Sequence, residues 1–387
     1  MPIRWSWTSH LAIWKSVLLW TLLAVPLGAV VGSAVAVFLW SLDLVTRTRL
    51  SHPWLLFTLP ALGFFVGWVY HRLGRDAERG NNLIIEQIHQ PGGGVPRRMA
   101  PLVLIGTLLT HLGGGSAGRE GTAVQMGGSL AATIARLFRL PPAITGTLLT
   151  AGIAAGFGAV FGTPFAGAIF ALEVLTIGRL SHAAMWPCLL AAVTGDLVCS
   201  AWNVQWLGLH FQIHHTHYAI ASFAKQTVAI DPVLLAKVAG ASVLFGLASV
   251  VFAELTHAIG HVFKKTIRYS PLRPAIGGVL VIGLTYALGT SDYLGLGVTP
   301  PSPGGVSIVT AFEPGGATAW GWAWKILFTA VTLGSGFKGG EVTPLFFVGA
   351  TLGNALAGVF GARRIYSPRW ASWPSSPGRR TRRWPAR

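Results

Sequence analysis

Long apolar stretches recur along the chain and limit what it can fold into. A helix needs about 20 mostly apolar residues to cross a bilayer, and Leu18–Leu42 reaches that length without a charged side chain. Only 11% of the residues are charged, whereas soluble domains carry about 25%. The sequence therefore predicts an all-α polytopic membrane protein. The apolar runs are Leu18–Leu42, Pro53–Tyr70, Pro101–Leu112, Ala143–Phe161, Pro164–Ile177, Ala184–Ala201, Val233–Phe252, Ile276–Leu288 and Ile326–Leu333.

Several of these runs are too short for a full crossing and are interrupted by glycine or proline. Such segments are typical of helices that tilt, stop midway or re-enter, and they must be buried among other helices because lipid cannot satisfy an open backbone. The 49 glycines of the chain favour close helix–helix contact through small residues. We therefore expect a bundle of tilted and broken helices.

A glycine-rich pattern occurs twice in the sequence. Leu112–Gly128 and Leu333–Gly349 share their leucine, four of their glycines, and a Glu-x-Thr at the same spacing. Two glycine-interrupted segments at corresponding positions of two halves point to a transporter's binding site. The repeat predicts a first membrane unit over residues 1–205 and a second, incomplete unit over residues 206–362.

Both copies also fit the G-x-G-x-x-G pattern of dinucleotide-binding proteins. That pattern has meaning only after a strand, at the start of a helix, within a βαβ unit. Each copy here follows a long apolar run with a helical length, and nothing alternates strand with helix. We therefore expect no dinucleotide and no other cofactor.

The two glycine-rich turns can form an anion site without a full positive charge. Each turn leaves free N–H groups where the next helix starts, and the helix dipole adds about half a charge there. Glu120 lies in the first turn, and its carboxylate resembles a bound anion. It can occupy the site as a gate, and its protonation would free the site. The alternative is an ordinary first-turn capping carboxylate, but acids within membrane segments are scarce and mostly functional.

These motifs resemble those of the CLC chloride channels and anion/proton exchangers. GREGT at Gly118–Thr122 is similar to that family's GREGP, Ala151–Glu173 to the stretch that follows it, and GGEVTP at Gly339–Pro344 to its GxFxP segment. The resemblance runs from the first span to about Phe360. It implies an inverted-repeat bundle in a bacterial inner membrane, and a homodimer. The implied anion-binding residues are Gly80, Asn81, Gly118, Arg119, Gly121, Thr122, Gly340, Glu341, Val342 and Thr343.

Three positions depart from the general family pattern. Asn81 stands for the serine of the GSGIP segment, Thr122 for the proline of GREGP, and Val342 for the phenylalanine of GxFxP. Together they resemble the fluoride/proton antiporter branch. An Asn amide offers N–H donors to a small, strongly hydrated anion. The expected cargo is fluoride exchanged with protons; the alternative is a chloride channel or chloride/proton exchanger.

Two further acids are open to more than one interpretation. Glu173 is next to Val174, which occupies the position where chloride/proton exchangers of the family carry an inner proton-transfer glutamate. Glu173 is therefore either a partnered structural acid or part of a proton path. Glu341 mirrors Glu120 in the repeat; it either tunes the site or caps a helix, and capping is favoured.

The formal net charge of +17 is not a sign of nucleic-acid binding. The basic residues lie at segment ends, as in cytoplasmic loops, and in the tail over residues 363–387. That tail is rich in Arg, Pro and Trp and is expected to be disordered, either as a lipid-bound tail or as a truncated or frameshifted end that omits the last helices. The resulting fragment would then be non-functional, which is a further alternative.

A cluster of histidines is the remaining candidate for chemistry. His210, His214, His215 and His217 lie between two spans, and His-rich tracts can bind metal. No carboxylate or cysteine accompanies them, so a solvated loop is favoured and no metal site is expected. An intramembrane hydrolase would need a histidine and an acid at one depth, and this cluster is far from Glu120 in sequence. We therefore do not expect an enzyme.

Overall fold

The described part of the chain is almost entirely helical. The computed structural model describes residues 7–90, 94–173, 182–203, 205–206, 209–210, 212–215, 232–313 and 315–361. The α-helices in these ranges are α1 Trp7–Ser51, α2 Leu59–Leu73, α3 Asn81–His89, α4 Met99–Leu112, α5 Glu120–Leu137, α6 Pro142–Phe161, α7 Pro164–Glu173, α8 His182–Ala201, α9 Pro232–Thr266, α10 Leu272–Leu288, α11 Gly321–Gly334 and α12 Val342–Val359. Short 3-10 turns cover Pro53–Thr58, Arg75–Ala77 and Thr310–Phe312.

Each apolar run that we identified forms a helix wherever it is described, which confirms the predicted all-α architecture. Outside the apolar runs, the described residues also form a small antiparallel ribbon, in which β1 (Gln205–Trp206) pairs with β2 (Leu209–His210). Within the described ranges, six helices are long and apolar enough to cross a membrane. The predicted tail over residues 363–387 and Val174 lie outside the described residues.

The helix lengths agree with the expectation of tilted and broken segments. With 45 and 35 residues, α1 and α9 are about 68 and 52 Å long at 1.5 Å per residue. Both exceed the roughly 30 Å hydrocarbon core of a bilayer, so they must tilt or extend beyond it. With 14 and 10 residues, α4 and α7 reach only about 21 and 15 Å. They cannot cross alone.

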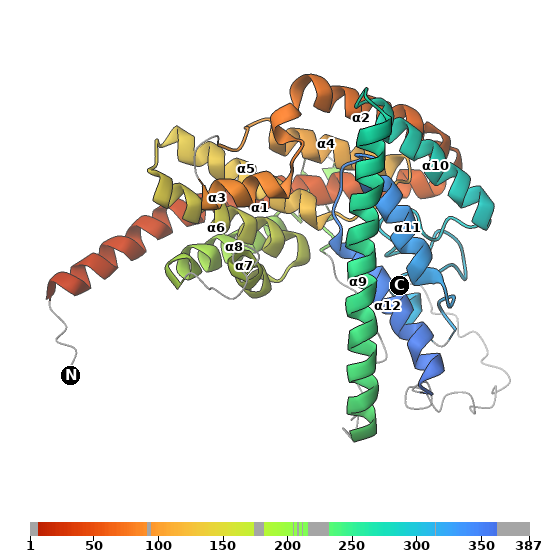
Figure 1. Cartoon of the computed structure of the whole chain (residues 1–387). Coiled ribbons are helices and arrows are strands. Elements are labelled where there is room, and N and C mark those ends of the chain that lie inside the picture. Colours follow the sequence, from red (N-terminus) through yellow and green to blue (C-terminus); the bar gives the residue numbers. More distant parts are fainter. Residues whose placement is uncertain are drawn as a thin grey trace, which may run out of the picture.

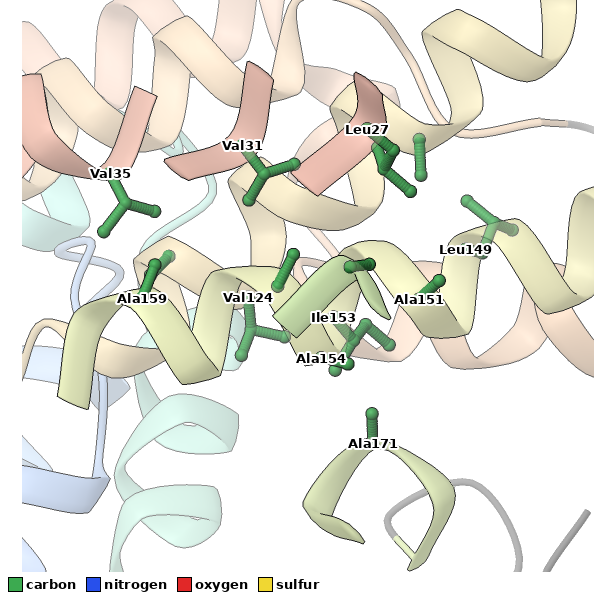
Figure 2. Close-up of a cluster of buried hydrophobic side chains, with 14 of the residues drawn as sticks. Leu27, Val31, Val35, Val124, Leu149, Ala151, Ile153, Ala154, Ala159 and Ala171 are labelled. Atoms are coloured by element: carbon green, nitrogen blue, oxygen red, sulfur yellow. The ribbon is translucent and has the colours of Figure 1, made fainter. Parts of the chain in front are cut away.

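Small residues hold the first half of the molecule together. A Cβ on Gly28 of α1 would lie 2.6 Å from the Ala191 oxygen of α8, and one on Gly152 of α6 would lie 2.8 Å from the Ala131 Cβ of α5. Backbones that approach so closely leave no room for larger side chains, which confirms the expected small-residue packing. Figure 2 shows the buried cluster where these helices meet, with Leu27, Val31, Val35, Val124, Leu149, Ala151, Ile153, Ala154, Ala159 and Ala171.

The second half of the molecule packs beside the first along α2 and α10. Figure 1 shows α9, α11 and α12 on one side, α1 with α5 to α8 on the other, and α2 next to α10 along one edge. A Cβ on Gly63 of α2 would lie 2.7 Å from the Pro274 oxygen of α10, and one on Gly278 of α10 would lie 2.8 Å from the Pro60 nitrogen of α2. Much of α9 presents apolar side chains to the outside, including Val243, Leu247 and Val250, as expected of a helix in contact with lipid.

The sequence repeat is also a repeat of helices. The long α1 corresponds to the long α9, and α2 to α10. The short helix α4 precedes the first glycine-rich turn and α5 follows it, just as α11 and α12 flank the second turn. The two turns therefore lie at equivalent places in the two halves.

Candidate functional site

The two glycine-rich turns meet directly. Gly118 and Gly340 form an isolated antiparallel bridge, in which the Gly118 N–H donates to the Gly340 oxygen at 2.6 Å and the Gly340 N–H donates to the Gly118 oxygen at 2.7 Å. Glycine is required here because a Cβ on Gly340 would lie 2.8 Å from the Gly121 nitrogen. The bridge brings the first residues of α5 and α12 together, so two positive helix ends converge on one point.

The Glu120 carboxylate occupies that point. Glu120 is fully buried at the first position of α5. Its Oε2 accepts hydrogen bonds from the Thr343 N–H at 3.2 Å and the Arg119 N–H at 3.1 Å, and its Oε1 accepts one from the Thr343 hydroxyl. The carboxylate of the first half is therefore bound by the helix start of the second half, and it does more than cap its own helix.

A cavity of about 410 Å³ opens beside this carboxylate. A third helix start reaches it, because α3 begins at Asn81 after Gly80, whose φ is +56°. The Asn81 amide nitrogen lies 3.6 Å from where a Cβ of Gly121 would be. Of the residues that the sequence indicated, those lining the cavity are Gly80, Asn81, Glu120, Gly121, Gly340, Glu341 and Val342.

The other indicated residues lie at the edge of this arrangement and do not line the cavity. Gly118 forms the bridge, and Arg119 and Thr343 hold the Glu120 carboxylate. Thr122 is fully buried and directs its hydroxyl to the Thr107 hydroxyl at 2.7 Å, away from Glu120. Thr122 is thus part of the packing between α4 and α5.

Glu341 does not cap α12 with its side chain, contrary to the interpretation that the sequence favoured. It occupies the N-cap position, but its carboxylate makes no capping hydrogen bond. Instead it is exposed and lines the cavity. The physical reason is that the N–H of Thr343, two residues into the helix, already donates to Glu120.

Three basic residues, two of them in the cavity wall, were not identified from the sequence. Lys338 and His257 line the cavity, and the Lys338 ammonium lies 4.1 Å from the centre of the Tyr70 ring. Lys325 of α11 is fully buried, with its ammonium 5.3 Å from the centre of the Phe347 ring. A single lysine in an apolar segment is a recognisable signal, and Lys338 interrupts the repeat where the first copy has Ala117.

The remaining candidates lie away from the cavity. Glu173 ends α7, is exposed, and is not among the lining residues. The His215 ring contacts the Ala159 oxygen at 2.9 Å and the Ser200 hydroxyl at 3.1 Å, while His217 lies outside the described residues. Within the described ranges, no three His, Cys, Asp or Glu side chains are grouped as a metal site would require.

Comparisons with known proteins agree with this geometry. A family model described as voltage gated chloride channel matches residues 62–368. The chain is 48% identical over 344 residues to a chloride/fluoride channel protein of Pseudomonas syringae pv. tomato, covering 87% of this chain and 72% of that protein. It is 26% identical over 362 residues to the voltage-gated ClC-type chloride channel ClcB of Salmonella typhi, covering 88% and 81%.

Solved structures give the same picture at the level of the fold. The crystal structure of a CLC-type fluoride/proton antiporter superposes with a TM-score of 0.78 at 32% sequence identity, covering 92% of this chain and 84% of that one. A slow cyanobacterial Cl⁻/H⁺ antiporter has a TM-score of 0.63 at 20% identity, covering 90% and 80%. The inverted-repeat bundle expected from the motifs is the fold of both.

Proposed function

The chain belongs to the voltage-gated chloride channel (CLC) family, and from that premise we propose that it is an integral membrane transporter that exchanges fluoride for protons. The family assignment agrees with the resemblance found in the sequence motifs. Members of this family move ions and do not transform substrates. The proposal therefore concerns which anion moves and how its movement is coupled to protons.

The position of the Glu120 carboxylate carries the proposal. Its two oxygens take three donors, the Thr343 N–H, the Thr343 hydroxyl and the Arg119 N–H. These donors are neutral, and together with two helix starts they suit any small anion. The carboxylate therefore stands where a transported anion would bind, and the two exclude each other.

Proton coupling follows from this exclusion. Protonation removes the charge for which the donors are arranged, so the neutral side chain leaves and an anion takes its place. When the anion departs, the deprotonated carboxylate returns. Because neutral donors hold an anion loosely enough to release it, each cycle moves an anion one way and a proton the other.

Fluoride is favoured over chloride by the residues around the donors. Fluoride is small and strongly hydrated, so it needs several short hydrogen bonds in place of water. The Thr343 hydroxyl and the Asn81 amide can supply them. The relative at 48% identity is named a chloride/fluoride channel, and the structure at 32% identity is a fluoride/proton antiporter. The second candidate function is chloride transport, which the names of the relatives at 26% identity favour.

Anion efflux from liposomes separates these candidates. Purified protein is reconstituted into vesicles loaded with fluoride and chloride, and efflux is followed with an electrode for each anion. We expect fluoride efflux to exceed chloride efflux, and an outward fluoride gradient to drive protons inward against their own gradient. Equal fluxes of the two anions would contradict fluoride selectivity, and fluoride efflux without proton movement would contradict coupling.

We propose that the membrane part of the chain consists of the two units expected from the sequence, one over residues 1–205 and the other over residues 206–362. The bilayer is the expected partner of the exposed apolar face of α9. A homodimer remains a proposal taken from the family resemblance. Light scattering of the detergent-solubilised protein would test it by giving the mass of one chain or of two.

A further inference from the structure

A second cavity, of about 80 Å³, lies apart from the one beside Glu120. Thr46 and Arg49 from the end of α1 line it, with His111 and Gly114 from the end of α4 and the loop from Ser291 to Pro301. The two cavities share no lining residue. The segment that carries Glu120 reaches both, because Gly114 lines the second cavity and Gly121 lines the first.

Two polar side chains at this cavity have buried atoms without a partner. The Arg49 Nε and the Thr46 hydroxyl oxygen make no hydrogen bond to any part of the chain that the structure describes. A left-handed glycine lets the guanidinium approach, since Gly114 has a φ of +85° and its Cβ would lie 2.9 Å from that Nε. Burying a donor of a charged group without an acceptor is costly, so this position calls for an acceptor, such as an anion.

The loop opposite Arg49 is shaped to donate hydrogen bonds. Gly295 and Gly297 have φ values of +56° and +76°, and alternating left-handed residues turn successive N–H groups toward one side, as in anion-binding nests. The Lys325 ammonium donates to the Tyr293 oxygen at 3.1 Å and the Gly295 oxygen at 2.8 Å. The Leu296 N–H, on the opposite edge of the Gly295–Leu296 peptide, therefore points away from Lys325, and Leu296 lines the cavity.

The charged side chain in the wall of this cavity is positive. It is Arg49, which lies there together with the buried His111 ring, and the Lys325 ammonium lies directly behind the loop. Asp292 belongs to the same loop but is not among the lining residues, which include no carboxylate. The His111 ring also contacts the Ala117 oxygen at 3.1 Å, which joins the wall to the gate turn one residue before Gly118.

From these contacts we propose that the cavity formed by Thr46, Arg49, His111 and the loop around Leu296 is a second binding site for a small inorganic anion. Its volume accommodates one halide ion and a water molecule or two, since a water occupies about 30 Å³. Binding here is independent of proton coupling. Only its role as a station on the path to the gate rests on the proposed function, in which it raises the local anion concentration near the turn that carries Glu120.

A cysteine placed in the wall tests anion binding without relying on transport. In Leu50→Cys, the introduced thiol lies at a lining position that is 39% exposed, and it is modified with an anionic or a cationic methanethiosulfonate reagent; the two native cysteines are buried. We expect the anionic reagent to react faster, and fluoride or chloride to slow the reaction in a saturable way. A reaction that neither anion slows, or equal rates with the two reagents, would overturn the proposal.

Three arginine variants show whether Arg49 holds the anion. Combining Leu50→Cys with Arg49→Gln should raise the anion concentration that gives half protection about tenfold, because a close positive charge is lost. Arg47→Gln is the matched control, since Arg47 is exposed and pairs with Asp43 at 2.8 Å. If Arg49→Gln and Arg47→Gln raised the half-protecting anion concentration equally, a specific site at Arg49 would be contradicted. Arg49→Lys keeps the charge and should retain most of the protection.

Transport kinetics then distinguish a failure of the second anion site from a failure of the proposed transport function. In liposomes, Arg49→Gln should raise the anion concentration for half-maximal flux while leaving the proton-to-anion ratio unchanged. A wild-type protein that moves no anion would end the proposed function, yet the protection experiment would still decide on the binding site. Unchanged half-saturation in Arg49→Gln, with protection lost, would remove the role as a station on the transport path.

Discussion

The two glycine-rich turns have nearly the same sequence but differ in what their acids do. Glu120 of the first turn is fully buried and bound by the second turn. Glu341 of the second turn is exposed to the larger cavity and makes no capping bond. A repeat in sequence thus brings two equivalent helix starts together, and only one of the two carboxylates enters the site they form.

The geometry of the antiparallel bridge explains part of this asymmetry. In an antiparallel pair, hydrogen-bonded and non-hydrogen-bonded residue pairs alternate along the strands. The repeat relates Gly118 to Gly339 and Arg119 to Gly340, so the pair Gly118–Gly340 is equivalent to the neighbouring pair Arg119–Gly339. Because bonded and non-bonded pairs alternate, only one of these two pairs can be hydrogen-bonded. Since Gly118 and Gly340 form the bonded pair, the Arg119 N–H is left to donate to Glu120. Its counterpart, the Gly340 N–H, is used in the bridge.

The Thr343 hydroxyl explains the rest of the asymmetry between the two acids. Thr122 and Thr343 are equivalent in the repeat, and the Thr122 hydroxyl is paired with Thr107 of α4. At the same spacing before Thr343, α11 carries Phe328, a fully buried side chain without a polar atom. The Thr343 hydroxyl therefore has no such partner in α11 and donates to Glu120. The second turn supplies the donors, and the first turn supplies the acid.

The largest expected effect comes from removing the acid that enters the site. Glu120→Gln keeps the shape of the side chain but cannot cycle between a charged and a neutral form, so we expect proton transport to fall to the background of protein-free liposomes. Proton movement driven by a fluoride gradient is the measurement. Glu341→Gln is the matched variant from the other turn and should retain proton coupling. Proton transport that persists in Glu120→Gln would remove Glu120 as the gate, and equal losses in both variants would erase the distinction between the turns.

The next effect concerns the donors of the second turn. Thr343→Val removes the hydroxyl and keeps both the backbone N–H and the volume of the side chain. A hydrogen bond to a charged group contributes about 1.5–3 kcal/mol, so the affinity for a transported anion should fall about tenfold or more. Anion concentration at half-maximal flux measures this loss. An unchanged value would mean that a transported anion does not take the position now held by the carboxylate.

A smaller effect is expected on stability, because the two halves differ in how tightly an equivalent glycine is packed. Gly128 and Gly349 are equivalent in the repeat, but a Cβ on Gly128 would lie 2.7 Å from the Ile84 Cδ1, and one on Gly349 would meet nothing within 4 Å among the described residues. We expect Gly128→Ala to destabilise the protein by about 1–3 kcal/mol through overpacking. Gly349→Ala should be neutral or stabilising by up to about 1 kcal/mol, since alanine favours a helix over glycine. Thermal unfolding in detergent compares them, and equal melting temperatures would show that Ile84 simply moves aside.

The sequence predicted the helices and the pairing of the two turns because apolar length and glycine spacing are local properties. It placed Glu120 correctly at a helix start, but it assigned Glu341 to capping because repeat symmetry says nothing about which residue pair of a bridge is bonded. Thr122 was grouped with the anion-binding residues because it belongs to the GREGT segment that resembles the family's GREGP. Its pairing with Thr107 depends on how α4 packs on α5. The cavity near Arg49 was also missed, since it joins the ends of α1 and α4 with a loop far along the chain.

The smallest expected effect on transport is at Thr122, the counterpart of Thr343. Thr122→Val leaves the Thr107 hydroxyl buried without its partner, so the free energy of unfolding should fall by about 1–3 kcal/mol. The Thr122 hydroxyl does not contact Glu120, so half-saturation and the proton-to-anion ratio should stay as in the wild type. The double variant Thr107→Val, Thr122→Val replaces both hydroxyls with apolar groups of the same shape, and most of the lost stability should return. If Thr122→Val weakened anion transport as much as Thr343→Val does, the two threonines would act alike, and the asymmetry would lie in the acids alone.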